Sequence, residues 1–174
     1  DFTHANGSFG AKWMPETMGS GVAFDDLDSD GDADVVLIND TWWPGHERRG
    51  AVPTSAAFAN DGSGYFSNVT DGSGLDVPVH GMGITAADYD ADGDKDLFLT
   101  TLGANLLLQQ LSPWHYENVA AAAGVEGSLW QDEEGRSHPE WSTAATWIDV
   151  DDDGLVDLFV GNYVQWSPEN ALYF

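Results

Sequence analysis

Short hydrophobic runs alternate along this chain with turns rich in Asp and Gly. The runs at 34–38, 96–100 and 157–161 are rich in β-branched and aromatic residues, and each begins at an Asp. Runs of this length and composition, bounded by turn residues, are typical of β-strands. Only 118–124, which holds four alanines, has the composition of a turn or two of helix. The pattern therefore predicts an all-β fold.

The strands fall into repeated units, each marked by one acidic turn. The first Asp of these turns stands at positions 26, 88 and 149, which are 62 and 61 residues apart. One strand precedes each turn, one follows it, and a second hairpin comes later in the first two units. The predicted strands are 21–24, 34–38, 56–59, 65–70, 83–86, 96–100, 105–109, 115–119, 144–147 and 157–161. Four strands in a unit of this length are typical of a β-propeller blade.

We interpret residues 1–174 as one partial propeller domain with about three blades. Its expected parts are the tail of a preceding blade (1–19), a first blade (20–80), a second blade (81–140) and an incomplete third blade (141–174) that begins its third strand at 170–174. Propellers close with roughly four to eight blades, and unpaired sheet edges are prone to aggregate. We therefore expect further blades, either from a continuation of the chain or from neighbouring subunits.

The charge of the chain is strongly acidic and unevenly placed. The formal net charge is −25, and sixteen of the 30 acidic residues lie at 25–34, 88–96 and 149–157. Packing so many carboxylates together is unfavourable unless a cation neutralises them. Nucleic acids and anionic lipids bind through Lys and Arg, of which there are five, so neither is an expected partner. The chain has no Cys, and no apolar run approaches the ~20 residues of a membrane-spanning helix.

Each acidic turn follows the pattern Asp-x-Asp-x-Asp-Gly-x-x-Asp, which predicts a calcium site. Calcium takes roughly six to eight oxygen ligands, and the Gly at position six allows the sharp turn that aims them at one centre. Position seven can add its backbone carbonyl. The predicted ligands are Asp26, Asp28, Asp30, Asp32 and Asp34; Asp88, Asp90, Asp92, Asp94 and Asp96; and Asp149, Asp151, Asp153, Leu155 and Asp157. We expect about three calcium ions, each structural, because a cage filled with protein ligands lacks the open position that metal catalysis needs.

An EF-hand, a magnesium site and a solvated turn fit this pattern less well than a calcium loop does. An EF-hand needs a Glu at position twelve between two helices, whereas Leu37, Leu99 and Val160 occupy that position within predicted strands. Magnesium prefers a small octahedral shell with several waters. A solvated Asp-Gly turn would account for one copy, but not for three copies in the same register.

The units resemble the FG-GAP or VCBS-type repeats of integrin α-subunit propellers and secreted bacterial proteins. They are also similar to the cartilage acidic protein family, in which such a propeller precedes a C-terminal ASPIC/UnbV segment. The stretches that carry this resemblance are 18–28, 60–66, 117–125, 141–147, 157–164 and 166–170. The resemblance implies a seven-bladed propeller, of which this chain is the N-terminal part. It also implies a secreted, calcium-stabilised protein with a binding or adhesion role and no known catalysis.

Two long insertions, at 41–54 and 126–140, are rich in aromatic residues and form the expected ligand face. Its candidate residues, for a protein or carbohydrate ligand, are Trp42, Trp43, His46, Trp130, His138 and Trp141. The alternative is that these residues pack between blades and close the loops. Sequons at Asn6, Asn39 and Asn68 are candidate glycosylation sites in a secreted chain.

The sequence leaves three kinds of function open. The expected one is an extracellular calcium-binding module for binding, adhesion or assembly. The second is a subunit of a polymer whose blade edges are completed by neighbours. The third is a hydrolase or lyase with its active site on the loop face or in a missing domain. No nucleophile elbow, zinc-protease motif or phosphate-binding glycine loop occurs, so we do not expect an enzyme.

Overall fold

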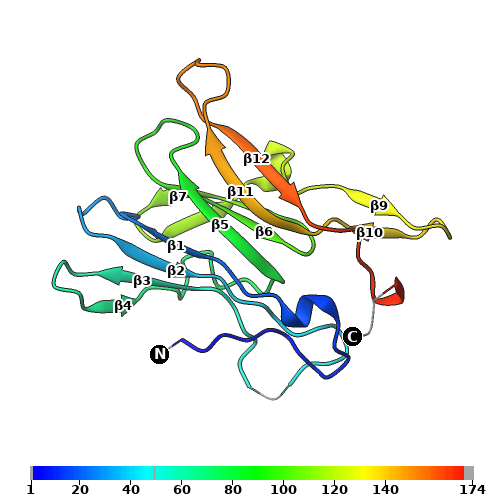
Figure 1. The fold of residues 1–174 in the computed structure, drawn as a ribbon. Helices are drawn as coiled ribbons and strands as arrows, with labels where there is room; N and C mark the ends of the chain where they lie inside the picture. Colours follow the sequence, from blue (N-terminus) through cyan, green and yellow to red (C-terminus); the bar gives the residue numbers. More distant parts are fainter. Residues whose placement is uncertain (1, 49, 171–174) are drawn as a thin grey trace.

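The computed structural model describes residues 2–48 and 50–170 as a set of antiparallel β-sheets (Figure 1). The first sheet has the order β1 (Val22–Asp25), β2 (Asp34–Leu37), β3 (Ala56–Asn60), β4 (Phe66–Asn68). The second has the order β5 (Gly81–Ala87), β6 (Asp96–Thr101), β7 (Leu106–Ser112), β8 (His115–Asn118). β11 (Ser142–Ile148) pairs with β12 (Asp157–Asn162), and β9 (Leu129–Gln131) pairs with β10 (Ser137–Pro139). We call β1–β4 the first unit, β5–β8 the second and β11–β12 the third.

This arrangement confirms the all-β prediction and its two four-stranded repeats. Each predicted strand overlaps an observed one, and the short helix α1 (Ala120–Ala123) lies where the alanines predicted it. Gly124 ends that helix with a left-handed backbone, φ 72°, as glycines commonly do. Two short 3₁₀ helices, η1 (Met14–Thr17) and η2 (Pro168–Asn170), complete the elements of the described residues.

Two details differ from the sequence prediction. β9 and β10 form a hairpin inside the insertion at 126–140, where the sequence lacks the alternation that marks a strand. The third strand expected at 170–174 does not begin at Asn170, which belongs to η2, and 171–174 lie outside the described residues.

The three units pack side by side through their first strands. β5 contacts both β1 and β11, and the three strands lie next to one another in Figure 1. Glycines permit the close approach, because a Cβ on Gly21 would lie 2.9 Å from Gly83 Cα, and one on Gly83 would lie 2.9 Å from the Thr143 carbonyl oxygen. Buried aliphatic side chains such as Leu97 and Leu99 fill the space between the first and second units.

The acidic loops and the insertions lie at opposite ends of the sheets. The loops β1–β2, β5–β6 and β11–β12 point to one side of the molecule (Figure 1), and the chain after β2, β6 and β12 emerges at the other. That second end is filled by an aromatic cluster that includes Trp13, Trp43, Trp141 and Trp166. This cluster supports the insertion loops at that end. The acidic loops lie at the other end and do not take part in it.

Within the described residues, no helix is long and apolar enough to span a membrane.

Within the described residues, the two outer faces of this stack carry exposed apolar side chains. Phe98 of the second unit is fully buried, whereas Phe159, at the equivalent place in β12, is 67% exposed. On the opposite flank, Val22 and Phe24 of β1 are 58% and 64% exposed. Large exposed apolar side chains such as these are candidates for an interaction surface.

Candidate metal centres

The three acidic loops share one backbone conformation. Position four has a left-handed backbone in each loop, with φ of 62° at Ser29, 60° at Ala91 and 62° at Asp152. The Gly at position six also has positive φ, for example 97° at Gly31. Non-glycine residues adopt this region at a cost of roughly 1–2 kcal/mol, so the repeated conformation is specified by the contacts of the loop.

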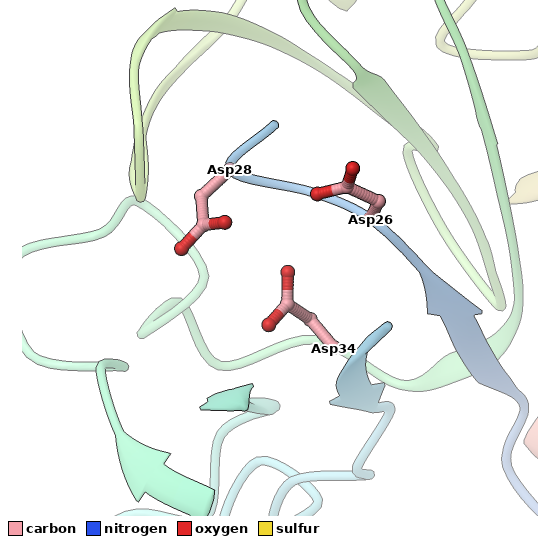
Figure 2. Close-up of side chains that lie close together, drawn as sticks. All are labelled: Asp26, Asp28 and Asp34. Carbon is pink, nitrogen blue, oxygen red and sulfur yellow. The ribbon is translucent and has the colours of Figure 1, made fainter. Parts of the chain in front are cut away.

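Each loop brings together the carboxylates of positions one, three and nine. The three groups are Asp26, Asp28 and Asp34; Asp88, Asp90 and Asp96; and Asp149, Asp151 and Asp157. In each group one oxygen per residue lies within 4.8 Å of the others, and Figure 2 shows the first group converging on the space between its side chains. The local sequence explains the convergence, since alternate residues of a tight coil point to one side and the following strand returns position nine to them.

Backbone amides hold these carboxylates in place. The position-one carboxylate accepts a hydrogen bond from the position-six glycine, as in Gly31 N to Asp26 Oδ2 at 3.0 Å. The position-nine carboxylate accepts one from position two, as in Leu27 N to Asp34 Oδ2 at 2.9 Å. The same two bonds recur in the second and third loops. These backbone bonds therefore orient the carboxylates of each loop.

Burial of the position-nine carboxylates makes their charged form unfavourable in the first two centres. Asp34 and Asp96 are fully buried, and their second oxygens accept bonds from Asn60 N and Gln110 N in the third strand of each unit. Desolvation raises the pKa of Asp34 above its usual value and that of Asp96 to about 6, although these bonds oppose the shift. Asp157 is exposed, because the described part of the third unit contains two strands. A cation would relieve the charge repulsion in the two buried centres.

Positions five and seven are arranged differently. The position-five carboxylates of Asp30, Asp92 and Asp153 turn back to accept hydrogen bonds from the position-seven amides, at 3.0, 3.0 and 2.8 Å. They are not among the grouped carboxylates. Ligation by Asp30, Asp92 and Asp153, and by the position-seven carbonyls of Asp32, Asp94 and Leu155, stays a prediction.

The donor set fits a hard divalent cation. All grouped ligands are carboxylate oxygens, which calcium and magnesium prefer over nitrogen or sulfur donors. In the first loop, Asp26 Oδ1 is shielded from solvent and has no hydrogen-bond partner among the described residues. A buried acceptor without a donor is unfavourable, and a bound cation would satisfy it.

Sequence reasoning missed two side chains of the second unit that donate to carboxylates at position three of the loops. Gln109 Nε2 donates to Asp90 Oδ2 at 2.6 Å, and Trp114 Nε1 donates to Asp28 Oδ2 at 2.9 Å. No local signal marks either residue, since Gln109 belongs to an ordinary strand and Trp114 is 86 residues from its partner. Only the packing of the units brings Trp114 to the first loop.

The structure divides the predicted ligand face into buried and accessible residues. Trp141 is fully buried and Trp43 is 7% exposed, and both pack in the aromatic cluster. Trp42, His46, Trp130 and His138 retain exposed surface. Trp130 lines a cavity of about 410 Å³ with polar residues that include Glu134, Arg136, Gln165 and Glu169. Two of the accessible residues, Trp130 and His138, lie in the β9–β10 hairpin, and the other two lie in the insertion at 41–54.

The three sequons also differ in accessibility. The Asn39 side chain is buried, and its Nδ2 donates to the Thr54 carbonyl at 3.1 Å, so a glycan on Asn39 does not fit this fold. Asn6 is half-buried and donates to the Glu16 carbonyl. Asn68 is exposed at the end of β4. Asn68 is thus the sequon best placed for modification.

Comparison with known proteins gives one match. Residues 26–99 match the family described as FG-GAP-like repeat, a stretch that contains the first two acidic loops and the strands between them. No curated protein matches the chain. The match supports the broader of the two resemblances, to FG-GAP or VCBS-type repeats, and an all-β, β-propeller-like module. The narrower resemblance, to the cartilage acidic protein family, has no support from it.

Proposed function

We propose that the chain is an extracellular module of a calcium-stabilised β-propeller, in which calcium is structural and the insertion loops bind a partner. The observation that carries this proposal is the repeated convergence of the carboxylates at positions one, three and nine. The FG-GAP-like match over 26–99 supports the propeller, with the first and second units as blades.

Calcium is the cation that these loops suit best. Its shell of about six to eight oxygens tolerates irregular geometry, whereas magnesium requires a compact octahedron and keeps several waters. Loops with three grouped carboxylates and further oxygens nearby can supply such a shell. Sites of modest affinity fill where calcium is abundant, as it is outside the cell, and this supports an extracellular location.

Calcium would act by holding each hairpin and its blade together. It would bridge position nine, at the start of the second strand, to positions one and three in the turn, and would replace the repulsion between carboxylates by attraction. No catalytic step is needed for this role, so we assign the chain no enzymatic activity.

The partner surface is the accessible part of the ligand face. Trp130, with the acidic and amide side chains around its cavity, offers an aromatic surface and hydrogen-bonding groups together. Such a combination suits a carbohydrate or a polar protein segment. We propose a carbohydrate or protein ligand there.

A second proposal concerns assembly. The exposed apolar faces at Val22 and Phe24, and at Ile148 and Phe159, would be covered by further blades, either from the same polypeptide or from neighbouring subunits. A polymer of such subunits is the alternative function that these faces favour.

A thermal melt with and without EDTA, combined with calcium titration calorimetry, tests the main proposal. We expect about three ions per chain and a large loss of stability in EDTA, since binding to the folded form alone adds about 4 kcal/mol per site at roughly a thousandfold excess over Kd. An unchanged melt and no heat of binding would reduce the loops to acidic turns and remove the basis of the proposal.

A further inference from the structure

The β7–β8 hairpin of the second unit reaches both of the first two acidic loops. From β7, Gln109 donates to Asp90 in the loop of its own unit, with an Nε2–Oδ2 distance of 2.6 Å. From the turn after β7, Trp114 donates to Asp28 in the loop of the first unit, with an Nε1–Oδ2 distance of 2.9 Å. Asp28 and Asp90 occupy the same place, position three, in their loops.

A second contact from the same hairpin joins the first loop. Gln110 Nε2 donates to the Leu27 carbonyl at 2.9 Å and to Tyr116 Oη at 2.7 Å. Gln110 and Leu27 are 2% and 0% exposed, so this bond lies in the interior between the units. The first loop is therefore joined to the second unit through both its backbone and its position-three carboxylate.

The backbone conformation of Trp114 supports a specific role for its hydrogen bond to Asp28. Its φ is 60°, a left-handed value that costs a bulky residue roughly 1–3 kcal/mol. The side chain is half-buried and packs against the core that the first and second units share. The turn that sets this backbone thus presents the indole to the neighbouring unit.

We propose that Trp114 and Gln109 are positioning residues for the first and second cation centres. Each neutral N–H donor binds Oδ2 of a position-three carboxylate and so fixes the orientation of that carboxylate, without adding a positive charge that would repel the cation. Hydrogen bonds of this kind to a metal-binding carboxylate are commonly worth 10- to 100-fold in metal affinity. The inference rests on the proposed cation sites.

The arrangement has a consequence for how the units dock. Because Trp114 belongs to the second unit and Asp28 to the first, cation binding at the first loop and docking of these units stabilise each other. Gln109 and Asp90 belong to one unit, so their hydrogen bond adds no link of this kind at the second centre. The cation at the first loop would therefore stabilise the contact between the first and second units.

Trp114→Phe and Gln109→Met keep most of each side chain and remove the donor. Calcium titration should show about tenfold weaker binding at one centre in each variant, and a different centre in the two. Terbium, used as a calcium substitute, should lose tryptophan-sensitised emission from one centre in Trp114→Phe. Trp13→Phe, which alters the aromatic cluster at the far end of the molecule, is the control and should leave both readouts unchanged.

A double-mutant cycle separates positioning from packing. If Trp114 acts through Asp28, the losses in calcium affinity of Trp114→Phe and Asp28→Asn are non-additive, whereas Trp114→Phe and Asp90→Asn add. Wild-type affinity in both Trp114→Phe and Gln109→Met would overturn the inference and leave the cation sites standing. Failure of the wild-type chain to bind calcium or terbium would overturn the proposed function as well.

Discussion

At the scale of single residues, the acidic loops combine strain, burial and like charge. Ala91 holds a left-handed backbone and Asp96 is a buried carboxyl, only five residues apart in one loop. Each feature alone is unfavourable. Together they indicate that the loop conformation serves to bring the carboxylates together. A bound cation would offset the repulsion between the carboxylates and the cost of burying them.

Burial of Asp96 predicts an unusual pH dependence in the absence of metal. Its pKa rises from 3.8 to about 6 in the folded chain, so the folded state binds this proton more tightly than the unfolded state. Protonation of Asp96 therefore stabilises the folded state. This stabilisation is fully present below about pH 4 and is lost as the pH rises through about 6, by an amount on the order of 2–3 kcal/mol.

Urea denaturation in EDTA across this pH range checks the expectation. We expect the metal-free protein to lose stability between pH 4 and 7, and calcium to restore it, because the cation takes the place of the proton. Asp96→Asn should have a smaller slope of stability against pH. An Asp96→Asn variant whose stability has the same pH slope as that of the wild-type chain would contradict the assignment.

At the scale of elements, the sheets pack through strands that carry glycine where they meet. Gly83 in β5 lies between Thr100 of β6 and Thr143 of β11, and the position has room for no side chain. The acidic loops owe their alignment to this packing, since each loop begins at the end of such a strand. Packing of the first strands therefore positions the three loops relative to one another.

Gly83→Ala should destabilise the fold by about 1–3 kcal/mol. The added Cβ would lie 2.9 Å from both Thr100 Oγ1 and the Thr143 carbonyl oxygen, so β5 and β11 would have to separate. Gly161→Ala in β12 is the matched control, because its Cβ would lie 3.8 Å from the Ala144 carbonyl oxygen, an ordinary van der Waals contact. Urea denaturation curves of the two variants should differ clearly, and equal stabilities would argue against close strand packing.

At the scale of the whole molecule, the units form a stack with two uncovered ends. Ile148 and Phe159 are exposed at one end, and Val22 and Phe24 at the other. In the second unit, where the third unit packs against the sheet, the equivalent residue Phe98 is fully buried. These exposed faces are the basis for the proposal that further blades or neighbouring subunits cover the two ends.

Phe159→Ser should weaken association of the chain without unfolding it. Phe159 is 67% exposed, so its loss should change stability by less than about 0.5 kcal/mol. Phe98→Ser, at the equivalent buried place, should cost roughly 3–5 kcal/mol. Sedimentation velocity over a range of concentrations measures association, and an unchanged distribution for Phe159→Ser would remove this face from the proposed interface.

Much of the fold and of the candidate centres could be predicted because the determinants are local. Strand positions follow from short apolar runs, and turns follow from Asp and Gly, so the strand order of the first two units was confirmed. The spacing of the Asp residues likewise predicted that carboxylates of each loop meet, since a tight loop is specified by its own residues. Of the predicted positions one, three, five, seven and nine, the structure groups one, three and nine.

Contacts between units could not be predicted in this way. Trp114 and Asp28 are 86 residues apart, and nothing in the residues around either one encodes their hydrogen bond. The β9–β10 hairpin is a second example, because its strands are short and pair inside a loop. Trp43 and Trp141 are a third example. The sequence made them candidates for a ligand face, but they are buried by packing against residues that are distant in the sequence.

The tripeptide Asp-Leu-Phe occurs twice, at 96–98 and at 157–159, and shows where the two kinds of information divide. Sequence alone determined that both copies begin a strand after an acidic loop, because the run and its turn are local. Only the tertiary structure decided that Phe98 is buried and Phe159 is exposed. Burial depends on what packs against a strand, and that neighbour comes from elsewhere in the chain or from another molecule.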